Sequence, residues 1–254
     1  MIDLHTHVLA GIDDGPDDLA GSVAVAEVAA HGGVRTIVAT PHLRADHPAV
    51  RPRELARRAA ELSDHLRERG LPVEILPGAE VDLQTAAELT DEELRLATLA
   101  GNGRDLLLET PYRRLPRSFE EQVLALADRG FRITLAHPER NGELKQDPDR
   151  VGALVERGVL VQLTARSLAG RPSKTSALLL ERGWAHVLAS DAHAIDMRPP
   201  DLGASVRQAA DAFPHASAEL EWMVSAAPRA ILDGRPLPDR PERAARRRRL
   251  RWPR

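Results

Sequence analysis

Short apolar runs recur along this chain, and an amphipathic stretch follows each of them. Runs of this kind are typical of buried strands, and the longer stretches between them are typical of helices. The seven runs are Ile2–Leu4, Thr36–Ala39, Val73–Leu76, Asp105–Leu108, Arg132–Leu135, Val159–Leu163 and His186–Ala189. Strands that alternate with helices form parallel βαβ units. The chain is therefore predicted to be an α/β protein built on a parallel sheet.

The stretches between the runs carry helix signals at both ends. The stretch Arg53–Arg69 ends at Gly70, and glycine just past a helix is a common C-cap. Ser118 and Glu121 predict a capping box for a helix that ends at Gly130. Because no linker divides the 254 residues, we expect one closed or nearly closed barrel, with an open doubly wound sheet as the alternative. No G-x-G-x-x-G or Walker sequence follows a strand to support nucleotide binding in such a sheet.

Composition excludes several kinds of chemistry. The chain has no cysteine, so disulfides, thiolate metal sites and thiol nucleophiles are absent, which fits a cytoplasmic protein. The net charge of −3 gives no indication of nucleic-acid binding. The first residues do not form a signal peptide, and no apolar run has the length of a membrane-spanning helix.

The C-terminal segment 236–254 differs from the rest of the chain. From Asp239 onward it has two acidic residues and eight arginines, at positions 240, 243, 246, 247, 248, 249, 251 and 254. We expect residues 1–235 to form a single domain and residues 236–254 to form a flexible, solvated tail. The alternative is a weak anchor for acidic partners or membrane surfaces.

Side chains that bind metals follow six of the seven predicted strands. They are His5, His7, Asp14, His42, Glu80, Glu109, His137, Asp191 and His193. In an extended strand, residues two apart point to the same side, so His5 and His7 should converge. Barrel enzymes place their catalytic groups at this end of the strands. The strand that ends at Gln162-Leu163-Thr164 has no obvious ligand.

Each of these residues alone has an ordinary structural explanation, such as a turn aspartate for Asp14. Together they indicate a metal centre, because buried charges are costly unless they are paired or metal-bound. Nine nitrogen and oxygen ligands exceed the needs of one ion, so we expect two or three divalent ions with Glu80 bridging. Imidazole mixed with carboxylate suits Mn, Fe or Zn, and such clusters perform hydrolysis.

Two arginines lie close in sequence to the predicted ligands. Arg140 follows His137 by three residues, and Arg198 follows Asp191-Ala192-His193 after a short loop. A guanidinium group at a metal site suits an anionic, forked substrate such as a phosphate monoester. For either arginine alone, a plain surface charge is the alternative.

These motifs resemble the PHP (polymerase and histidinol phosphatase) superfamily, and more closely its bacterial manganese-dependent protein-tyrosine phosphatases of capsule and exopolysaccharide loci. The similarity extends from residue 1 to about residue 235. It rests on Met1-Ile2-Asp3-Leu4-His5-Thr6-His7, Gly11-Ile12-Asp13-Asp14-Gly15, Thr40-Pro41-His42, Gly78-Ala79-Glu80-Val81, Leu108-Glu109-Thr110-Pro111, Ala136-His137-Pro138-Glu139-Arg140 and Ser190-Asp191-Ala192-His193. The arginine-rich tail departs from the family pattern.

The resemblance implies a distorted (β/α)7 TIM-like barrel of the PHP fold that holds three metal ions, with manganese expected and Fe or Zn as alternatives. The implied sets are His5, His7, Glu80 and Asp191 for one ion, Glu80, Glu109 and His137 for a second, and Asp14, His42 and His193 for a third. Arg140 and Arg198 would bind the phosphate.

The implied activity is hydrolysis of phosphotyrosine on a bacterial tyrosine kinase that regulates capsule or exopolysaccharide synthesis. Because the chain has no cysteine, a metal-bound hydroxide would attack phosphorus. One alternative is a histidinol phosphatase or a broad small-molecule phosphatase of the same superfamily. Another is a non-catalytic metal-binding scaffold. A nuclease-like module is disfavoured by the acidic charge balance and the lack of a basic aromatic groove.

Overall fold

The computed structural model describes residues 1–112 and 114–245. All of its strand pairings are parallel, and they form two sheets of order β1-β2-β4 and β3-β5-β6-β7-β8-β9. The strands are β1 (Ile2–Thr6), β2 (Thr36–Ala39), β3 (His42–Leu43), β4 (Glu74–Pro77), β5 (Glu80–Val81), β6 (Asp105–Glu109), β7 (Arg132–Ala136), β8 (Leu160–Thr164) and β9 (Val187–Ala189). The prediction of an α/β protein with parallel strands is confirmed.

The two sheets follow one another around a distorted barrel. Strands β3 and β5 continue β2 and β4, because the register that pairs Thr36 with Glu74 also pairs His42 with Glu80. At the other edge, Thr6 forms a parallel bridge with Ala192, and the backbone N–H of Asp191 donates to the carbonyl of His5 at 2.9 Å. The strands therefore occupy seven positions, one for each predicted run, and the second and third strands are interrupted.

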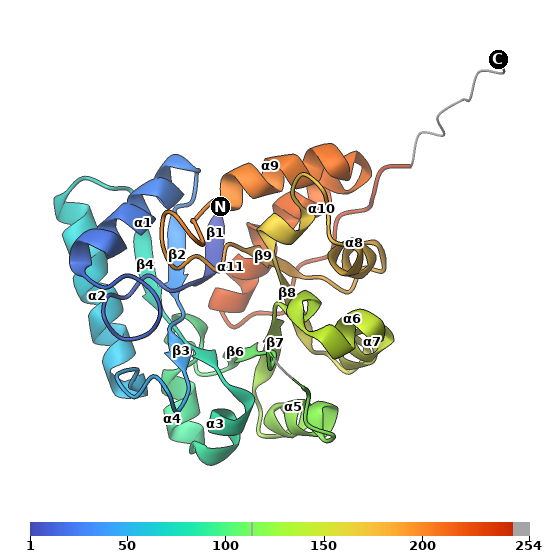
Figure 1. Cartoon of the computed structure of the whole chain (residues 1–254), viewed down its shortest axis with the longest axis horizontal. Coiled ribbons are helices and arrows are strands. Elements are labelled where there is room, and N and C mark those ends of the chain that lie inside the picture. The colour runs from blue at the N-terminus through green and yellow to red at the C-terminus, as the bar shows by residue number, and fades with distance from the viewer. Residues whose placement is uncertain (113, 246–254) are drawn as a thin grey trace.

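Helices lie around the strands (Figure 1). They are α1 (Leu19–His31), α2 (Pro52–Glu68), α3 (Leu83–Glu88), α4 (Asp91–Leu96), α5 (Phe119–Asp128), α6 (Gly142–Gln146), α7 (Asp149–Glu156), α8 (Lys174–Glu181), α9 (Leu202–Ala212), α10 (Ser217–Trp222) and α11 (Ala226–Leu232). Short 3-10 turns η1 (Leu99–Gly101), η2 (Pro138–Arg140), η3 (Ala165–Leu168) and η4 (Pro214–Ala216) join some of them. Among the described residues, no helix combines the length and the apolar character needed to cross a membrane.

The predicted capping box at Ser118 is wrong. Helix α5 does begin there, but the Ser118 side chain makes no capping hydrogen bond. Its hydroxyl accepts from Nε2 of Gln122 at 2.7 Å instead, and the Ser118 backbone is not in the extended conformation that an N-cap requires. A reciprocal capping box is present one helix earlier, where Thr90 and Glu93 cap α4.

The apolar core has two parts. A large cluster fills the space between strands and helices, and helix α2 contributes to it with buried Leu55, Leu62 and Leu66. A smaller cluster includes Leu107 of β6 and Leu160 of β8 together with apolar residues of α11. Because strand side chains alternate, Leu107 and Leu160 share their faces with Glu109 and Gln162. The smaller apolar cluster therefore lies directly before the polar residues at the ends of β6 and β8.

The first part of the predicted flexible tail is held against the body of the protein. Arg240 and Arg243 both donate to the carboxylate of Glu219, with N–O distances of 2.7 and 2.9 Å. Glu219 is buried, so its charge requires such partners, and the expectation of a solvated terminus does not hold for these two arginines. The other six arginines of the tail lie in residues 246–254, outside the described residues.

Candidate metal centre

The nine predicted ligands converge where β1, β2, β4, β6, β7 and β9 end, and His42 and Glu80 are the first residues of β3 and β5. They form four overlapping groups, and within each group the ligand atoms lie within 4.8 Å of one another. The groups are His7, Asp14, His42 and His193; His5, Glu80 and His137; His5, His7 and Asp191; and His42, Glu80 and Glu109. Eight of the nine are buried, and Asp14 is the exposed one. The strand-end pattern in the sequence thus corresponds to one compact cluster.

The inner half of the cluster is built on β1. Nε2 of His5 lies 3.3 Å from Oε2 of Glu80 and 3.3 Å from Oδ1 of Asp191. Nε2 of His7 lies 3.5 Å from the same two oxygens. The register of β1 against β2 shifts between Asp3 and Thr6, so the strand is irregular where these histidines turn toward the centre. The two imidazoles and two carboxylates match the first predicted metal site.

In the outer half, His137 and His42 contact different oxygens of Glu80. His137 Nε2 lies 2.7 Å from Oε1 of Glu80, whereas His42 Nδ1 lies 3.0 Å from the other Glu80 oxygen and 3.7 Å from Oε2 of Glu109. Nε2 of His42 also lies 3.6 Å from Oδ1 of Asp14, so its imidazole stands between Asp14 and Glu109. The set of Glu80, Glu109 and His137 that the resemblance implies stays a prediction. Glu80 lies in the middle of the whole cluster, as expected for a bridging carboxylate.

The buried polar atoms of the cluster fit divalent ions. Both carboxylate oxygens of Glu80, Oδ1 of Asp191, Oε2 of Glu109 and Nδ1 of His42 are buried and face other atoms of the cluster, without a hydrogen bond of regular geometry within the described chain. Such atoms are costly to bury alone. Ligand atoms that share one ion at about 2.0–2.2 Å lie roughly 3.0–3.5 Å apart, as the His5, His7, Glu80 and Asp191 atoms do. The donor set and its spacing suit Mn, Fe or Zn.

The electrostatics of the cluster also favour added cations. Burial and the neighbouring Glu80 carboxylate raise the pKa of Glu109 to about 7. Burial would raise the pKa of Glu80 as well, but His5, His137 and His42 together hold it well below its usual range. Burial lowers the pKa of His193 to about 4, which keeps its imidazole neutral and able to act as a ligand.

Two of the predicted ligands occupy backbone conformations that are rare for residues other than glycine. His137 has φ of 34° and Asp191 has φ of 53°, both at the ends of strands. Hydrogen bonds fix both positions, since the His137 N–H donates to the Gln162 carbonyl and the Asp191 N–H donates to the His5 carbonyl. Left-handed residues of this kind are held in place by their surroundings and are concentrated at functional sites.

Two supporting residues were missed by the sequence analysis. Oε1 of Gln162 lies 3.0 Å from Nδ1 of His5, and Oδ2 of Asp13 lies 2.7 Å from Nδ1 of His7. A hydrogen bond on Nδ1 fixes the orientation of an imidazole and leaves Nε2 to face the cluster. The only signal for Gln162 was a polar residue inside the apolar run 159–163, and Asp13 was hidden beside the predicted ligand Asp14.

An open cleft of about 550 Å³ leads from the cluster to the surface, and its lining carries several cations. The lining residues include Asp14, His42, Glu109 and His137, the cations Arg44, Arg140, Lys145 and Arg198, and Tyr112. Arg140 and Arg198 both donate to Oδ2 of Asp191, and the Arg198 bond measures 2.6 Å. Arg44, which the sequence analysis did not single out, lies 3.2 Å from Oε1 of Glu109.

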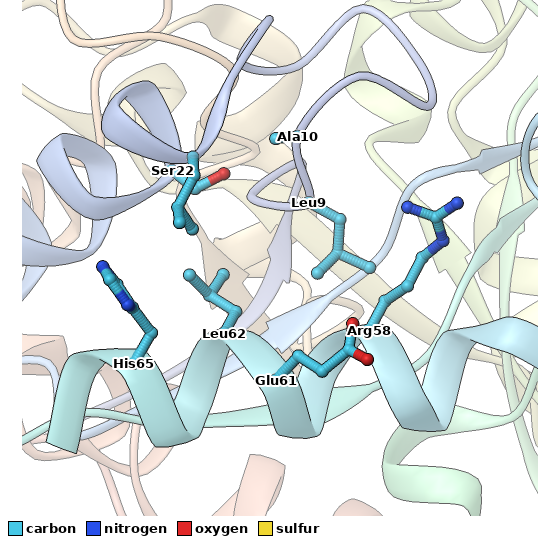
Figure 2. A pocket seen from close by; sticks show the side chains of 8 residues that line it. Leu9, Ala10, Ser22, Arg58, Glu61, Leu62 and His65 are labelled. Carbon is cyan, nitrogen blue, oxygen red and sulfur yellow. The ribbon is translucent and has the colours of Figure 1, made fainter. Parts of the chain in front are cut away.

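A separate cavity of about 260 Å³ lies between α1, α2 and the loop after β1. Figure 2 shows Leu9 and Leu62 facing this space, with Arg58, Glu61 and His65 projecting from α2. None of the nine predicted ligands lines it. His65 lies on α2, and its Nε2 accepts a hydrogen bond from Nε of Arg69.

The sequence is similar to proteins that are named as phosphatases. Tyrosine-protein phosphatase YwqE of Bacillus subtilis is 35% identical over 202 residues, covering 78% of this chain and 79% of that protein. Tyrosine-protein phosphatase CpsB of Streptococcus pneumoniae is 30% identical over 214 residues, covering 79% of this chain and 86% of that protein.

Solved structures agree with these sequence matches. A structure from a study of YwqE and CpsB, described there as unique metal-dependent tyrosine phosphatases, superposes with a TM-score of 0.81 at 30% identity, covering 97% of this chain and 100% of that one. A lactonase mutant from Deinococcus radiodurans shares the fold alone, with a TM-score of 0.57 at 18% identity over 92% of this chain and 95% of that one. Residues 1–232 match the family described as capsular polysaccharide synthesis, CpsB/CapC. The chain therefore belongs to the CpsB/CapC family.

Proposed function

We propose that this chain is a metal-dependent phosphatase that hydrolyses phosphotyrosine in proteins. The observation that carries the proposal is the cluster of nine predicted nitrogen and oxygen ligands, eight of them buried, with Arg140 and Arg198 both bonded to Asp191 at its edge. Tyrosine phosphatases more commonly use a cysteine nucleophile, and this chain has none. The names of YwqE and CpsB support the phosphotyrosine assignment.

The cluster would hold two or three divalent ions, and we propose manganese, with iron or zinc as alternatives. His5, His7, Glu80 and Asp191 would hold the inner ion, and His42, Glu109, His137, Asp14 and His193 would complete the outer sites around the shared Glu80. When bound, such ions activate water and stabilise charge on phosphoryl oxygens. The buried oxygens of Glu80, Asp191 and Glu109, whose partners in the cluster are mainly histidines, support this assignment.

The two arginines would bind and orient the phosphoryl group. Their guanidinium groups line the cleft and are already directed toward the cluster by their bonds to Asp191. A guanidinium group can donate two parallel hydrogen bonds to a phosphate, which fixes its orientation as well as its position. Arg140 is part of η2, directly after the cluster residue His137, whereas Arg198 comes from the loop after β9.

The physiological substrate that we propose is a bacterial tyrosine kinase that controls capsule or exopolysaccharide synthesis in the cytoplasm. The description of the CpsB/CapC family supports the link to capsule synthesis. A phosphotyrosine on a flexible segment of such a kinase could enter the open cleft, whose cations complement its charge.

Hydrolysis of a phosphotyrosine peptide and of histidinol phosphate, each with added Mn²⁺, tests the proposal. We expect a higher kcat/KM for the peptide. A clear preference for histidinol phosphate would move the chain to the small-molecule phosphatases of the superfamily. Failure to hydrolyse either substrate or para-nitrophenyl phosphate, in protein that binds metal, would favour the non-catalytic scaffold.

A further inference from the structure

The only tyrosine of the chain lies at the rim of the cleft. Tyr112 follows the predicted ligand Glu109 by three residues and lines the same cleft as Arg140 and Arg198. Its side chain is 80% exposed. The chain contains few aromatic residues, and Phe119 in the following helix is by contrast fully buried. An exposed aromatic ring at this position contributes little to the core, so its role lies at the cleft.

The exposure of Tyr112 does not come from an unattached loop. The hydroxyl of Thr110 donates to the carbonyl of Ala136, and Nδ2 of Asn141 donates to the carbonyl of Pro111 at 2.7 Å. Both bonds tie the backbone just before Tyr112 to the end of β7 and the start of α6. The backbone just before the tyrosine is thus held against the residues that follow β7, while its ring stays exposed.

The free ring also lacks an aromatic partner within residues 1–112 and 114–245. The ring-to-ring contacts of this region join histidines to one another and Phe213 to His215. Aromatic rings favour offset-stacked or edge-to-face contacts with another ring. A ring that enters the cleft alongside Tyr112 would supply such a contact.

The geometry of the cleft indicates which part of a substrate would do so. If the phosphate lies between the buried cluster and the two arginines, the group esterified to it must point toward the cleft opening, where Tyr112 stands. On the basis of the phosphatase function proposed above, we propose that Tyr112 is a specificity-determining residue that stacks against the aromatic ring of an aryl phosphate. An alkyl phosphate offers no ring and gains nothing from this contact.

The test compares phenyl phosphate with glycerol phosphate, using the metal-loaded wild type and the variants Tyr112→Ala and Tyr112→Phe. We expect Tyr112→Ala to lower kcat/KM for phenyl phosphate by about two- to tenfold, mainly through KM, because one aromatic pair contributes about this much. For glycerol phosphate, we expect kcat/KM to stay within about twofold. Because each variant is compared with wild type on the same substrate, the different leaving groups cancel. Tyr112→Phe should keep the aryl preference, since it keeps the ring.

A matched control is Met197→Ala. Met197 is 81% exposed and lies on another strand-end loop, outside the lining of the cleft. We expect it to leave the ratio of the two substrates unchanged. Equal losses on both substrates in Tyr112→Ala, no loss on either, or a Tyr112→Phe variant as impaired as Tyr112→Ala would each overturn the proposal. Failure of the wild type to hydrolyse either substrate or a phosphotyrosine peptide would instead refute the phosphatase function on which the proposal rests.

Discussion

Oε1 of Gln162 lies 3.0 Å from Nδ1 of His5, and both side chains are fully buried. An amide oxygen can only accept a hydrogen bond, so Nδ1 must carry the proton. Nε2 of His5 then presents its lone pair to the side where the Glu80 and Asp191 oxygens lie. Gln162 thus selects the imidazole tautomer that can bind a cation.

Replacement of this glutamine should weaken metal binding. We expect Gln162→Leu to lower the affinity for Mn²⁺ by about 10- to 100-fold, as is typical when a partner of a metal-binding histidine is removed. Competition with a chelator of known affinity measures the change. Thr134→Val is a matched control, because it removes a buried hydroxyl that makes no hydrogen bond in the described chain. Equal affinities for Gln162→Leu and wild type would show that Gln162 does not orient His5.

Arg140→Ala should reduce turnover and leave the metals bound. Removal of one preorganised donor to a developing negative charge typically costs about 10²–10³ in kcat. Arg140→Lys should recover only part of the loss, because it keeps the charge but not the forked geometry. His137→Ala should lose metal together with activity. If Arg140→Ala retained near-normal kcat/KM on a phosphotyrosine peptide, the phosphate-binding role would pass to Arg198.

The contacts of the C-terminal segment should contribute to stability. Arg243→Ala removes hydrogen bonds to the buried Glu219 and to two backbone carbonyls of α8. We therefore expect the free energy of unfolding to fall by about 1–3 kcal/mol. Arg235→Ala is the control, because Arg235 pairs with Asp233 in a more exposed setting and should change stability by less than about 1 kcal/mol. Unfolding in urea measures the change in the free energy of unfolding for both variants. Equal effects would mean that the segment is not anchored at Glu219.

His186 should make the protein less stable in acid. Burial and the nearby Arg240 lower its pKa to about 3, and its Nδ1 accepts from the backbone N–H of Val161. Between about pH 6.5 and pH 3 the unfolded chain binds a proton at this position that the folded chain does not, so this contribution lowers stability as pH falls.

His186→Asn keeps an acceptor for Val161 but cannot titrate in this range. From pH 7 to pH 5 we expect wild type to lose up to about 2 kcal/mol more stability than His186→Asn. Urea unfolding of both proteins at the two pH values gives this difference directly. Because both proteins share all other titrating groups, this difference cancels their contributions. One such group is Asp3, whose raised pKa increases stability as the pH falls. Parallel pH profiles would show that His186 titrates normally in the folded state.

The seven strands and their parallel arrangement could be predicted because apolar runs recur along the chain between amphipathic stretches. All seven predicted strands are present, with boundaries that move by at most two residues. The short strands β3 and β5 were missed, since two residues give no periodic signal. The Ser118 capping box failed for a different reason, because Gln122 competes for the same hydroxyl group.

The members of the cluster could be predicted, whereas the contacts among their side chains could not. Residues such as His5 and Asp191 were identifiable because charged side chains at the ends of apolar strands are rare. Which oxygen of Glu80 faces His42 and which faces His137 depends on side-chain rotamers and on the left-handed backbone of His137. The spacing of residues in the sequence carries no information on these rotamers or on that backbone conformation. For the same reason, the contact between Arg44 and Glu109 appears only in the structure.

The central claim is that a multinuclear metal cluster performs the hydrolysis. The most direct measurement is a titration of Mn²⁺ into EDTA-treated protein, in which bound metal and phosphotyrosine peptide hydrolysis are followed together. The account predicts no activity without metal, and full activity only when more than one ion per chain is bound. Full activity with one ion or fewer, or activity that survives EDTA, would contradict it.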